Sequence, residues 1–187
     1  MDQANVAELV KQAQGGDRDA FGVLMEMHQA LAYRMAYRLT GQADAAEAVT
    51  QDAFVQAYRS LPQFKGKSRF TTWLYSILAR KAVDRHRSQR RSRASFSLDE
   101  QPAIHKDFRR APSPTPAEEM QGRELGELLL RAMMDLPSDQ RAALAMVAQE
   151  GLTYRDAAEA LGCSEGTVAW RVWNARRLLR EMLKAHL

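Results

Sequence analysis

The chain has 187 residues, with 27 Lys and Arg against 23 Asp and Glu, and 45% of its residues are hydrophobic. These values are typical of a chain that folds around a buried core, and they exclude generic disorder and collagen-like character. No run of about 18 uncharged apolar residues and no signal-peptide pattern is visible, so we expect a cytoplasmic protein without membrane insertion.

One cysteine, Cys163, and four scattered histidines exclude an internal disulfide and give no metal-ligand spacing. We therefore expect no metal and no other cofactor. Cys163 is expected to be a small buried apolar residue rather than a redox thiol.

Positive charge is concentrated in two blocks of the sequence. Residues 61–93 contain ten basic residues and one acidic residue, and residues 165–187 contain five basic and two acidic residues. The segments before and between these blocks carry a net negative charge. Two separated basic blocks are expected where one chain meets a polyanion at two places, although a solvated basic face would explain either block alone.

The first two predicted helices follow from apolar residues spaced three and four positions apart. A short helix ends at Gly15 and Gly16. Asp17 can cap a second helix, which carries His28 on its apolar face and closes near Gly41.

A third and a fourth helix are predicted in the next stretch. The third begins at Asp44 and has Tyr58 on its apolar side. After a loop, Thr71 or Thr72 is expected to cap the fourth helix. This helix should fray from Arg85 onward, because its basic residues repel one another.

Helical periodicity fails between Ala94 and Ala117, where the APSPTP run cannot continue a helix. Fully extended, this segment could span on the order of 80 Å. Periodicity resumes at Glu118, breaks at Pro137 and then continues. We therefore predict an all-α fold with two small helical domains, residues 1–93 and 118–187, joined by a flexible linker over residues 94–117.

The second predicted domain contains the pattern of a helix-turn-helix. Thr153 and Asp156 form a variant of the capping box, Gly162 ends a short helix, and Ser164 caps the next one. The apolar residues of this second helix form one buried seam. Trp173 is also expected to pack inside the domain.

The opposite face of that helix is polar and basic, which suits the major groove of duplex DNA. Its N-terminal amides and Ser164 can meet phosphate, while Arg171 and Asn174 can reach base edges. An ordinary helical hairpin with a basic surface is the alternative. The residues expected to contact duplex DNA are Ser164, Thr167, Trp170, Arg171, Asn174 and Arg177.

The first basic block interleaves aromatic and cationic side chains. This combination suits single-stranded nucleic acid, because an unstacked base regains about 1–3 kcal/mol on a ring while the cations follow the backbone. Phe70 is expected in the core, and Trp73 either packs there or presents one edge to a base. The residues expected to contact a single strand are Phe64, Lys65, Arg69, Trp73, Ser76, Arg80, Lys81 and Arg87.

Three stretches together resemble the extracytoplasmic-function (ECF) group of bacterial RNA polymerase sigma factors. They are DAAEAVTQDAFVQAYRSL (residues 44–61), FKGKSRFTTWLYSILARKAVDRHR (64–87) and LPSDQRAALAMVAQEGLTYRDAAEALGCSEGTVAWRVWNARRLLREML (136–183). Their order and separation are more specific than a lone helix-turn-helix. The resemblance implies a transcription initiation factor, rather than an enzyme, that binds core RNA polymerase and directs it to promoter DNA.

The resemblance also implies a role for each segment. The loop and helix after residue 64 would recognise the −10 element and hold a base from its melted strand, and the helix-turn-helix would read the −35 element as duplex. An anti-sigma factor is a plausible further partner that covers these surfaces. The exposed face of the third helix would dock on core RNA polymerase through Glu47, Gln51, Asp52 and Gln56.

Four positions depart from the pattern of the family. Arg80 stands where related sequences often have Asn, and Asn174 replaces a frequent Arg. Ala169 and Trp170 occupy positions that often hold a basic residue and Ser. Fewer cations on the recognition helix mean fewer phosphate contacts, so no promoter consensus of the family is transferred to this chain.

Two other functions compete with this prediction. A conventional helix-turn-helix repressor or activator would bind duplex DNA without polymerase, usually as a symmetric dimer, but it gives no reason for the aromatic and basic loop. A nucleic-acid enzyme would need a His/Cys cluster, a paired-carboxylate site or a phosphate-binding Gly loop, and the sequence shows none of these.

Overall fold

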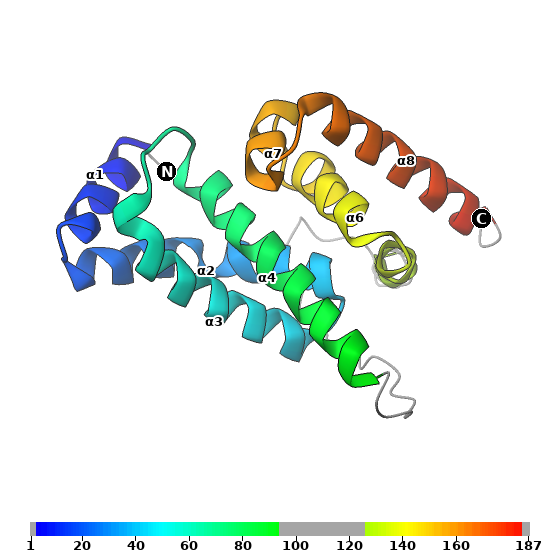
Figure 1. The fold of residues 1–187 in the computed structure, drawn as a ribbon, viewed down its shortest axis with the longest axis horizontal. Coiled ribbons are helices and arrows are strands. Elements are labelled where there is room, and N and C mark those ends of the chain that lie inside the picture. Colours follow the sequence, from blue (N-terminus) through cyan, green and yellow to red (C-terminus); the bar gives the residue numbers. More distant parts are fainter. Residues whose placement is uncertain (1–2, 94–125, 185–187) are drawn as a thin grey trace, which may run out of the picture.

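A computed structural model describes residues 3–93 and 126–184, and every regular element in these two ranges is helical. The all-α fold predicted from the apolar spacing is therefore confirmed. Figure 1 shows two groups of helices side by side, which we call the N-terminal module (residues 3–93) and the C-terminal module (residues 126–184). The expected linker, residues 94–117, lies outside the described residues.

The N-terminal module is a bundle in which α2, α3 and α4 pack on one another and α1 covers one end. Asp17 and Gly41 delimit α2 as predicted. The Asp17 carboxylate accepts hydrogen bonds from the backbone N–H groups of Asp19 (2.9 Å) and Ala20 (3.1 Å). Gly41 ends the helix with φ = 71°, a conformation that favours glycine. The elements are α1 (Gln3–Gln14), α2 (Arg18–Thr40), α3 (Ala43–Ser60), the short 3₁₀ turn η1 (Leu61–Gln63) and α4 (Phe70–Arg93).

Helix α4 differs from the sequence prediction at both ends. It begins at Phe70, so neither Thr71 nor Thr72 caps it, and Thr72 is buried inside its first turn. It also continues to Arg93, through the basic residues that were expected to fray it. Like charges three or four positions apart on a helix do repel, but each pair costs only about 0.2–0.5 kcal/mol, which is too little to end the helix here.

The C-terminal module contains the predicted helix-turn-helix, formed by α7 and α8. Its caps are confirmed: the Thr153 hydroxyl accepts from the N–H of Asp156 (3.1 Å), and the Ser164 hydroxyl accepts from the N–H of Thr167 (3.1 Å). Gly162 ends α7 in the left-handed conformation. The elements are a helix over residues 126–134, α6 (Ser138–Leu144), one π turn η2 (Ala145–Gln149), α7 (Tyr154–Leu161) and α8 (Glu165–Leu183).

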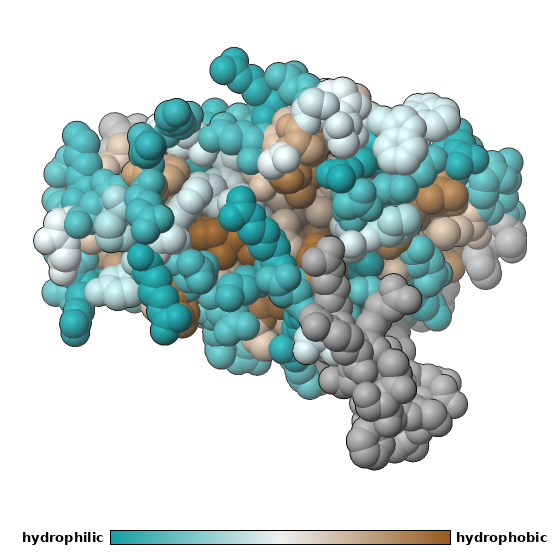
Figure 2. Space-filling model, in the orientation of Figure 1, coloured by the Kyte–Doolittle hydropathy of each residue, from teal (hydrophilic) through white to brown (hydrophobic). Residues whose placement is uncertain are grey.

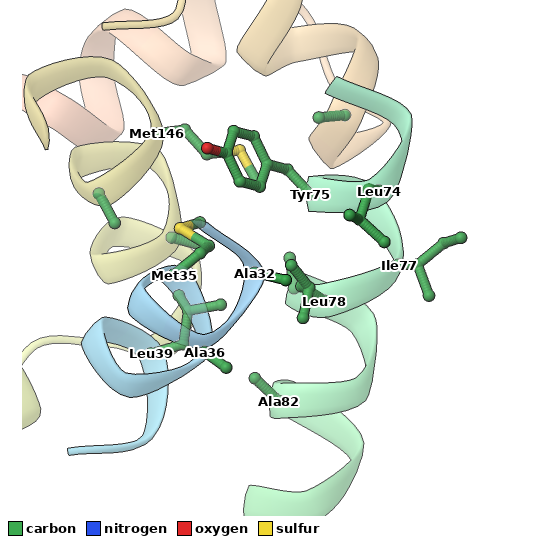
Figure 3. Close-up of a cluster of buried hydrophobic side chains, with 14 of the residues drawn as sticks. Ala32, Met35, Ala36, Leu39, Leu74, Tyr75, Ile77, Leu78, Ala82 and Met146 are labelled. Atoms are coloured by element: carbon green, nitrogen blue, oxygen red, sulfur yellow. The ribbon is translucent and has the colours of Figure 1, made fainter. Parts of the chain in front are cut away.

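One hydrophobic core runs through both modules. In Figure 3, Tyr75 and Leu78 of α4 and Met35 of α2 lie in the same buried cluster as Met146 of η2. All four side chains are at most 2% exposed. The two modules are therefore packed against each other, which no local pattern in the sequence indicated.

Candidate nucleic-acid interface

A groove with a volume of about 570 Å³ runs along α4. We call it the α4 groove. Its walls carry hydroxyls and amides that can bond base edges, two cations (Arg80 and Lys81) that can meet phosphates, and two carboxylates (Asp84 and Glu159). The lining side chains of the N-terminal module include Gln56, Gln63, Ser68, Thr72, Trp73, Ser76, Arg80 and Lys81.

The Trp73 side chain is partly packed against other rings and partly exposed. Its ring lies 4.8 Å from that of Phe64 and 5.7 Å from that of Phe70, measured between centroids. Phe70 is 4% exposed and stacks edge-on against His28, so its expected place in the core is confirmed. Trp73 is half-buried and also lines the α4 groove, so one part of the ring packs while another faces the space where a base could stack.

The other residues expected to contact a single strand divide into two sets. Arg80 is exposed and Lys81 half-buried, and both line the α4 groove. Ser76 lines it too, but its side chain is buried and its hydroxyl donates to the carbonyl of Trp73 at 2.6 Å. Lys65 and Arg69 are exposed on the loop before α4, outside the groove lining.

Arg87 belongs to α4 by its backbone, but its side chain lies outside the described residues. Its position in the sequence places it two turns beyond Arg80 on the same helix. Its role in contacting a single strand stays a prediction.

The outer face of α8 presents two tryptophans to solvent. Trp170 is 55% exposed and Trp173 is 60% exposed, so the expectation that Trp173 packs is wrong. The seam of Val168, Val172 and the residues that follow occupies the buried side, and Trp173 lies away from it. The Arg177 guanidinium lies 5.8 Å from the Trp173 ring, a cation–π arrangement on the exposed face.

Arg171 and Asn174 are engaged within the protein. The Arg171 Nε lies 3.0 Å from the Asp139 carboxylate, and the Asn174 amide donates to the Gln140 side chain at 3.0 Å. Both partners belong to α6, so these two residues hold α6 against α8. To reach base edges they would have to exchange these partners for DNA.

The outer face of α3 carries the polar residues expected to dock on polymerase. Glu47, Gln51 and Asp52 are exposed, and the Gln51 amide donates to the Glu47 carboxylate at 3.3 Å. Gln56 is half-buried and lines the α4 groove instead. The structure thus joins Glu47 and Gln51 on one side of α3, leaves Asp52 exposed about 100° further around the helix, and places Gln56 beside the nucleic-acid residues.

A second, mainly apolar groove of about 540 Å³ lies between α2 and α3, next to Gln51. We call it the α2–α3 groove. Met25, Val55 and Tyr58 line it and are 40%, 51% and 43% exposed. Tyr58 was expected on the buried side of α3, and this is wrong: its ring packs edge-on against Phe21 at 5.0 Å and leaves the rest in solvent.

Sequence reasoning missed the α2–α3 groove. The available signal was a pair of apolar residues, Val55 and Tyr58, three positions apart on a helix face that is otherwise polar. Exposed apolar side chains gathered beside charged ones are typical of protein–protein contact surfaces.

Within residues 3–93 and 126–184, no group of His, Cys, Asp and Glu lies close enough together to hold a metal ion. None of the helices in these ranges combines the length and apolar character needed to cross a bilayer. Figure 2 shows one face of the molecule as mainly hydrophilic, with hydrophobic patches between the polar side chains.

Comparison with protein families finds two matches in the chain. Residues 24–92 match sigma-70 region 2, and residues 126–179 match sigma-70 region 4. The ECF RNA polymerase sigma-E factor of Haemophilus influenzae is 32% identical over 178 residues, which cover 94% of each chain. The RNA polymerase sigma-H factor of Pseudomonas aeruginosa is 31% identical over 179 residues, which cover 95% of this chain and 93% of that one.

Two solved structures match as well. The sigma factor RpoE, in complex with the anti-sigma factor NepR from Bartonella quintana, superposes with a TM-score of 0.70 and 27% identity over 88% of this chain and 96% of that one. CnrH, in complex with the cytosolic domain of CnrY, superposes with a TM-score of 0.68 and 25% identity over 98% of this chain and 99% of that one. Both matches extend over the two modules.

Proposed function

The chain belongs to the extracytoplasmic-function group of the sigma-70 family, and we propose how its surfaces divide the work of such a factor. It is a transcription initiation factor that directs core RNA polymerase to promoters, and the polymerase performs the synthesis. The observation that carries the proposal is the position of Trp73. Its ring packs on Phe64 and also faces a groove lined by Arg80 and Lys81.

The α4 groove binds an unpaired base of the −10 element. Extruding a base from the duplex costs a few kcal/mol, and stacking on an aromatic ring returns about 1–3 kcal/mol per base. The Trp73 ring is already fixed by its aromatic neighbours, so it loses little side-chain entropy when a base stacks on it. Arg80 and Lys81 then hold the backbone of the displaced strand by charge.

The outer face of α8 binds the −35 element as duplex. Ser164 and the first amides of α8 offer a phosphate site at the helix N-terminus. Trp170 and Arg177 stand on the exposed face, where Trp170 can contact a thymine methyl and Arg177 a phosphate or a guanine edge. Thr167, Arg171 and Asn174 border this face.

The outer face of α3 binds core RNA polymerase. Glu47, Gln51 and Asp52 supply charge and hydrogen bonds, and the neighbouring α2–α3 groove supplies apolar area that a partner can cover. Because polymerase holds both modules at once, neither module needs to bind promoter DNA tightly by itself.

An anti-sigma factor is a further partner of this chain. One solved structure with the same two modules, the sigma factor RpoE, was co-crystallised with the anti-sigma factor NepR. Since polymerase and chromosomal DNA are the partners of the active factor, we place its action in the cytoplasm.

Transcription in vitro tests the proposed function. Purified chain and core polymerase are combined on a library of genomic fragments, and promoter-specific transcripts are expected when both are present. A conventional repressor or activator would instead bind a specific duplex without polymerase in a gel shift. Such binding, together with an absence of transcripts, would contradict the proposal.

Charge reversal on α3 tests the polymerase surface. Asp52→Lys should weaken binding to core polymerase about tenfold, which corresponds to about 1.4 kcal/mol. Glu8→Lys, at an exposed position on α1, is the matched control and should leave the affinity unchanged. Equal affinities for the two variants would place the docking surface elsewhere.

A further inference from the structure

We propose that Gln14, the last residue of α1, is a positioning residue for the α4 groove: it clamps the turn before α4 and thereby fixes Phe64 against Trp73. The proposal rests on the proposed function, because it concerns the groove assigned to the unpaired base. It gives α1 a part in base recognition, although the match to sigma-70 region 2 begins only at residue 24.

The side-chain amide of Gln14 bonds to two backbone carbonyls at once. Its Nε2 donates to the carbonyl of Leu61 at 2.9 Å and to the carbonyl of Phe64 at 2.7 Å, 47 and 50 positions further along the chain. The amide nitrogen of a glutamine carries two N–H groups, so both of its donors are used here. Gln14 therefore holds two nearby points of the chain through a single atom.

The part of the chain held in this way is η1, which links α3 to the loop before α4. Leu61 at its start is 1% exposed, and the N–H of Phe64 closes the turn by donating to the Leu61 carbonyl at 3.0 Å. A backbone carbonyl has two lone pairs, so that of Leu61 can accept from Phe64 and from Gln14 together. Neither end of the turn can move away without breaking one of these bonds.

Gln14 is itself held in place at the end of α1. The helix ends in a Schellman motif, in which the N–H of Gly16 donates to the carbonyl of Ala13 at 3.1 Å and the N–H of Asp17 donates to that of Gln12 at 3.1 Å. Asp17 also caps α2, so a hydrogen-bonded connection joins the two helices. Gln14 therefore presents its amide from a fixed support.

Phe64 connects this clamp to the base-binding ring. Its ring lies 4.8 Å from the ring of Trp73 and 6.4 Å from that of Phe70, distances at which aromatic pairs attract. Because Gln14 fixes the Phe64 backbone, it also fixes the point from which this side chain reaches Trp73. If Phe64 could shift, Trp73 would take several orientations, and a base that stacks on it would have to pay the entropy of ordering the ring.

The clamp also sets the start of the basic loop that follows it. Residues 64–69 have no helical structure, and Lys65, Lys67 and Arg69 on this loop are exposed. Exposed loops with few buried contacts are among the more mobile parts of a protein. A fixed start limits where these cations can lie, so the clamp orders the loop beside the groove as well as the ring inside it.

Combined changes in protein and DNA test the role of Gln14. The holoenzyme is bound to promoter templates in which the non-template strand of the −10 element is unpaired, and each base of the element is removed in turn to leave an abasic site. We define the base advantage at a position as the ratio of the affinities with and without its base. For the wild-type chain, the position with the largest base advantage identifies the base held in the α4 groove.

Two variants of Gln14 should lower the base advantage at that position. Gln14→Met keeps the length of the side chain but removes both donors, and should lower it about three- to tenfold. Gln14→Glu places an oxygen against the two carbonyls and should lower it at least as much. Gln12→Met and Gln12→Glu are the matched controls and should leave it unchanged, because Gln12 is exposed on the same helix and bonds to Glu8 of α1.

The ratio separates positioning from a loss of folded protein. A variant that only folds less well would bind the base-containing and the abasic templates more weakly by the same factor, so its base advantage would not change. A base advantage equal to that of the wild type in both Gln14 variants would therefore overturn the proposal. A wild-type chain without a base advantage at any position would instead contradict the base-binding role of the α4 groove, and that result does not depend on the Gln14 variants.

Discussion

The Tyr75 hydroxyl donates to the Glu150 carboxylate at 2.5 Å, across 75 positions of the sequence. Tyr75 lies two residues after Trp73, so the two side chains leave α4 in different directions. One helix thereby contributes both to the proposed base-binding groove and to the joint between the modules. The effect of substituting Trp73 on DNA binding can therefore be measured separately from the effect of substituting Tyr75 on the contact between the modules.

Tyr75 predicts a loss of stability at alkaline pH. Burial raises the pKa of this phenol to about 12, whereas an unfolded chain has a tyrosine pKa near 10. The folded state therefore favours the protonated phenol, and its contribution is complete below about pH 10 and is lost as the pH rises towards 12. This loss should be on the order of 3 kcal/mol once the pH has passed 12, since each pKa unit corresponds to about 1.4 kcal/mol.

Urea unfolding followed by circular dichroism at pH 9, 10 and 11 measures this dependence. Tyr75→Phe is the control, because it keeps the buried ring and removes the titrating group. The difference between the free energies of unfolding of the two proteins should shrink as the pH rises. Parallel curves would contradict the assignment.

We expect position 41 to require glycine, because the packing of the two modules leaves no room for a side chain there. Gly41→Ala should lower the free energy of unfolding by more than the ~1 kcal/mol cost of a left-handed alanine, because the new methyl group would collide with Met134. Gly16→Ala is a matched control: Gly16 also has a positive φ, but nothing lies within 4 Å of its added Cβ. Urea denaturation of both variants should show the larger loss at Gly41. Equal losses would mean that Met134 can move aside freely.

Trp73 predicts a defect in strand opening rather than in duplex binding. Trp73→Ala should reduce open-complex formation about 10- to 100-fold, since it removes about 1–3 kcal/mol of stacking. Permanganate reactivity of thymines in the −10 element measures opening, and a gel shift of the holoenzyme at low temperature measures duplex binding. Trp73→Phe keeps an aromatic ring and should retain most of the opening. A proportional fall in both measurements would contradict the single-strand role.

Two variants can distinguish a DNA-contacting role of Arg171 from a role in holding α6 against α8. Arg171→Ala should weaken transcription that depends on the −35 element about tenfold, because one base or phosphate contact is lost. Asp139→Ala removes the same ion pair but leaves Arg171 free to meet DNA. Both variants should lose less than about 1 kcal/mol of stability, since the Asp139 side chain is half-exposed and such pairs are screened by water. Equal transcription defects would mean that Arg171 serves to hold α6.

Several features of the fold could be predicted because their physical causes are local. The caps at Asp17, Thr153 and Ser164 bond backbone groups within three residues, so neighbouring positions in the sequence suffice to identify them. The spacing of apolar residues likewise predicted the helices. The two predictions that failed on α4, its start and its fraying, concern helix ends, where tertiary packing competes with local preference.

Side-chain exposure on a helix surface was harder to predict. Trp173 and Tyr58 are aromatic, so hydrophobicity favours burial for both, yet Trp173 is 60% exposed and Tyr58, which packs only partly on Phe21 of α2, is 43% exposed. The reverse holds for Ser76, whose polar side chain is buried because it bonds to its own helix. Which face is covered depends on where the other helices pack.

The sequence by itself determined the helices, the helix-turn-helix, the two basic blocks and the family, because each depends on residue types at short and regular spacings. Only the tertiary structure decided that the two modules close on each other, that Glu150 joins α2 and α4, and that α7 lines the α4 groove. These contacts join residues 75 to 112 positions apart. Several pairings of amphipathic helix faces can bury similar apolar area, and the buried hydrogen bonds at Glu150 and Arg141 select one of them.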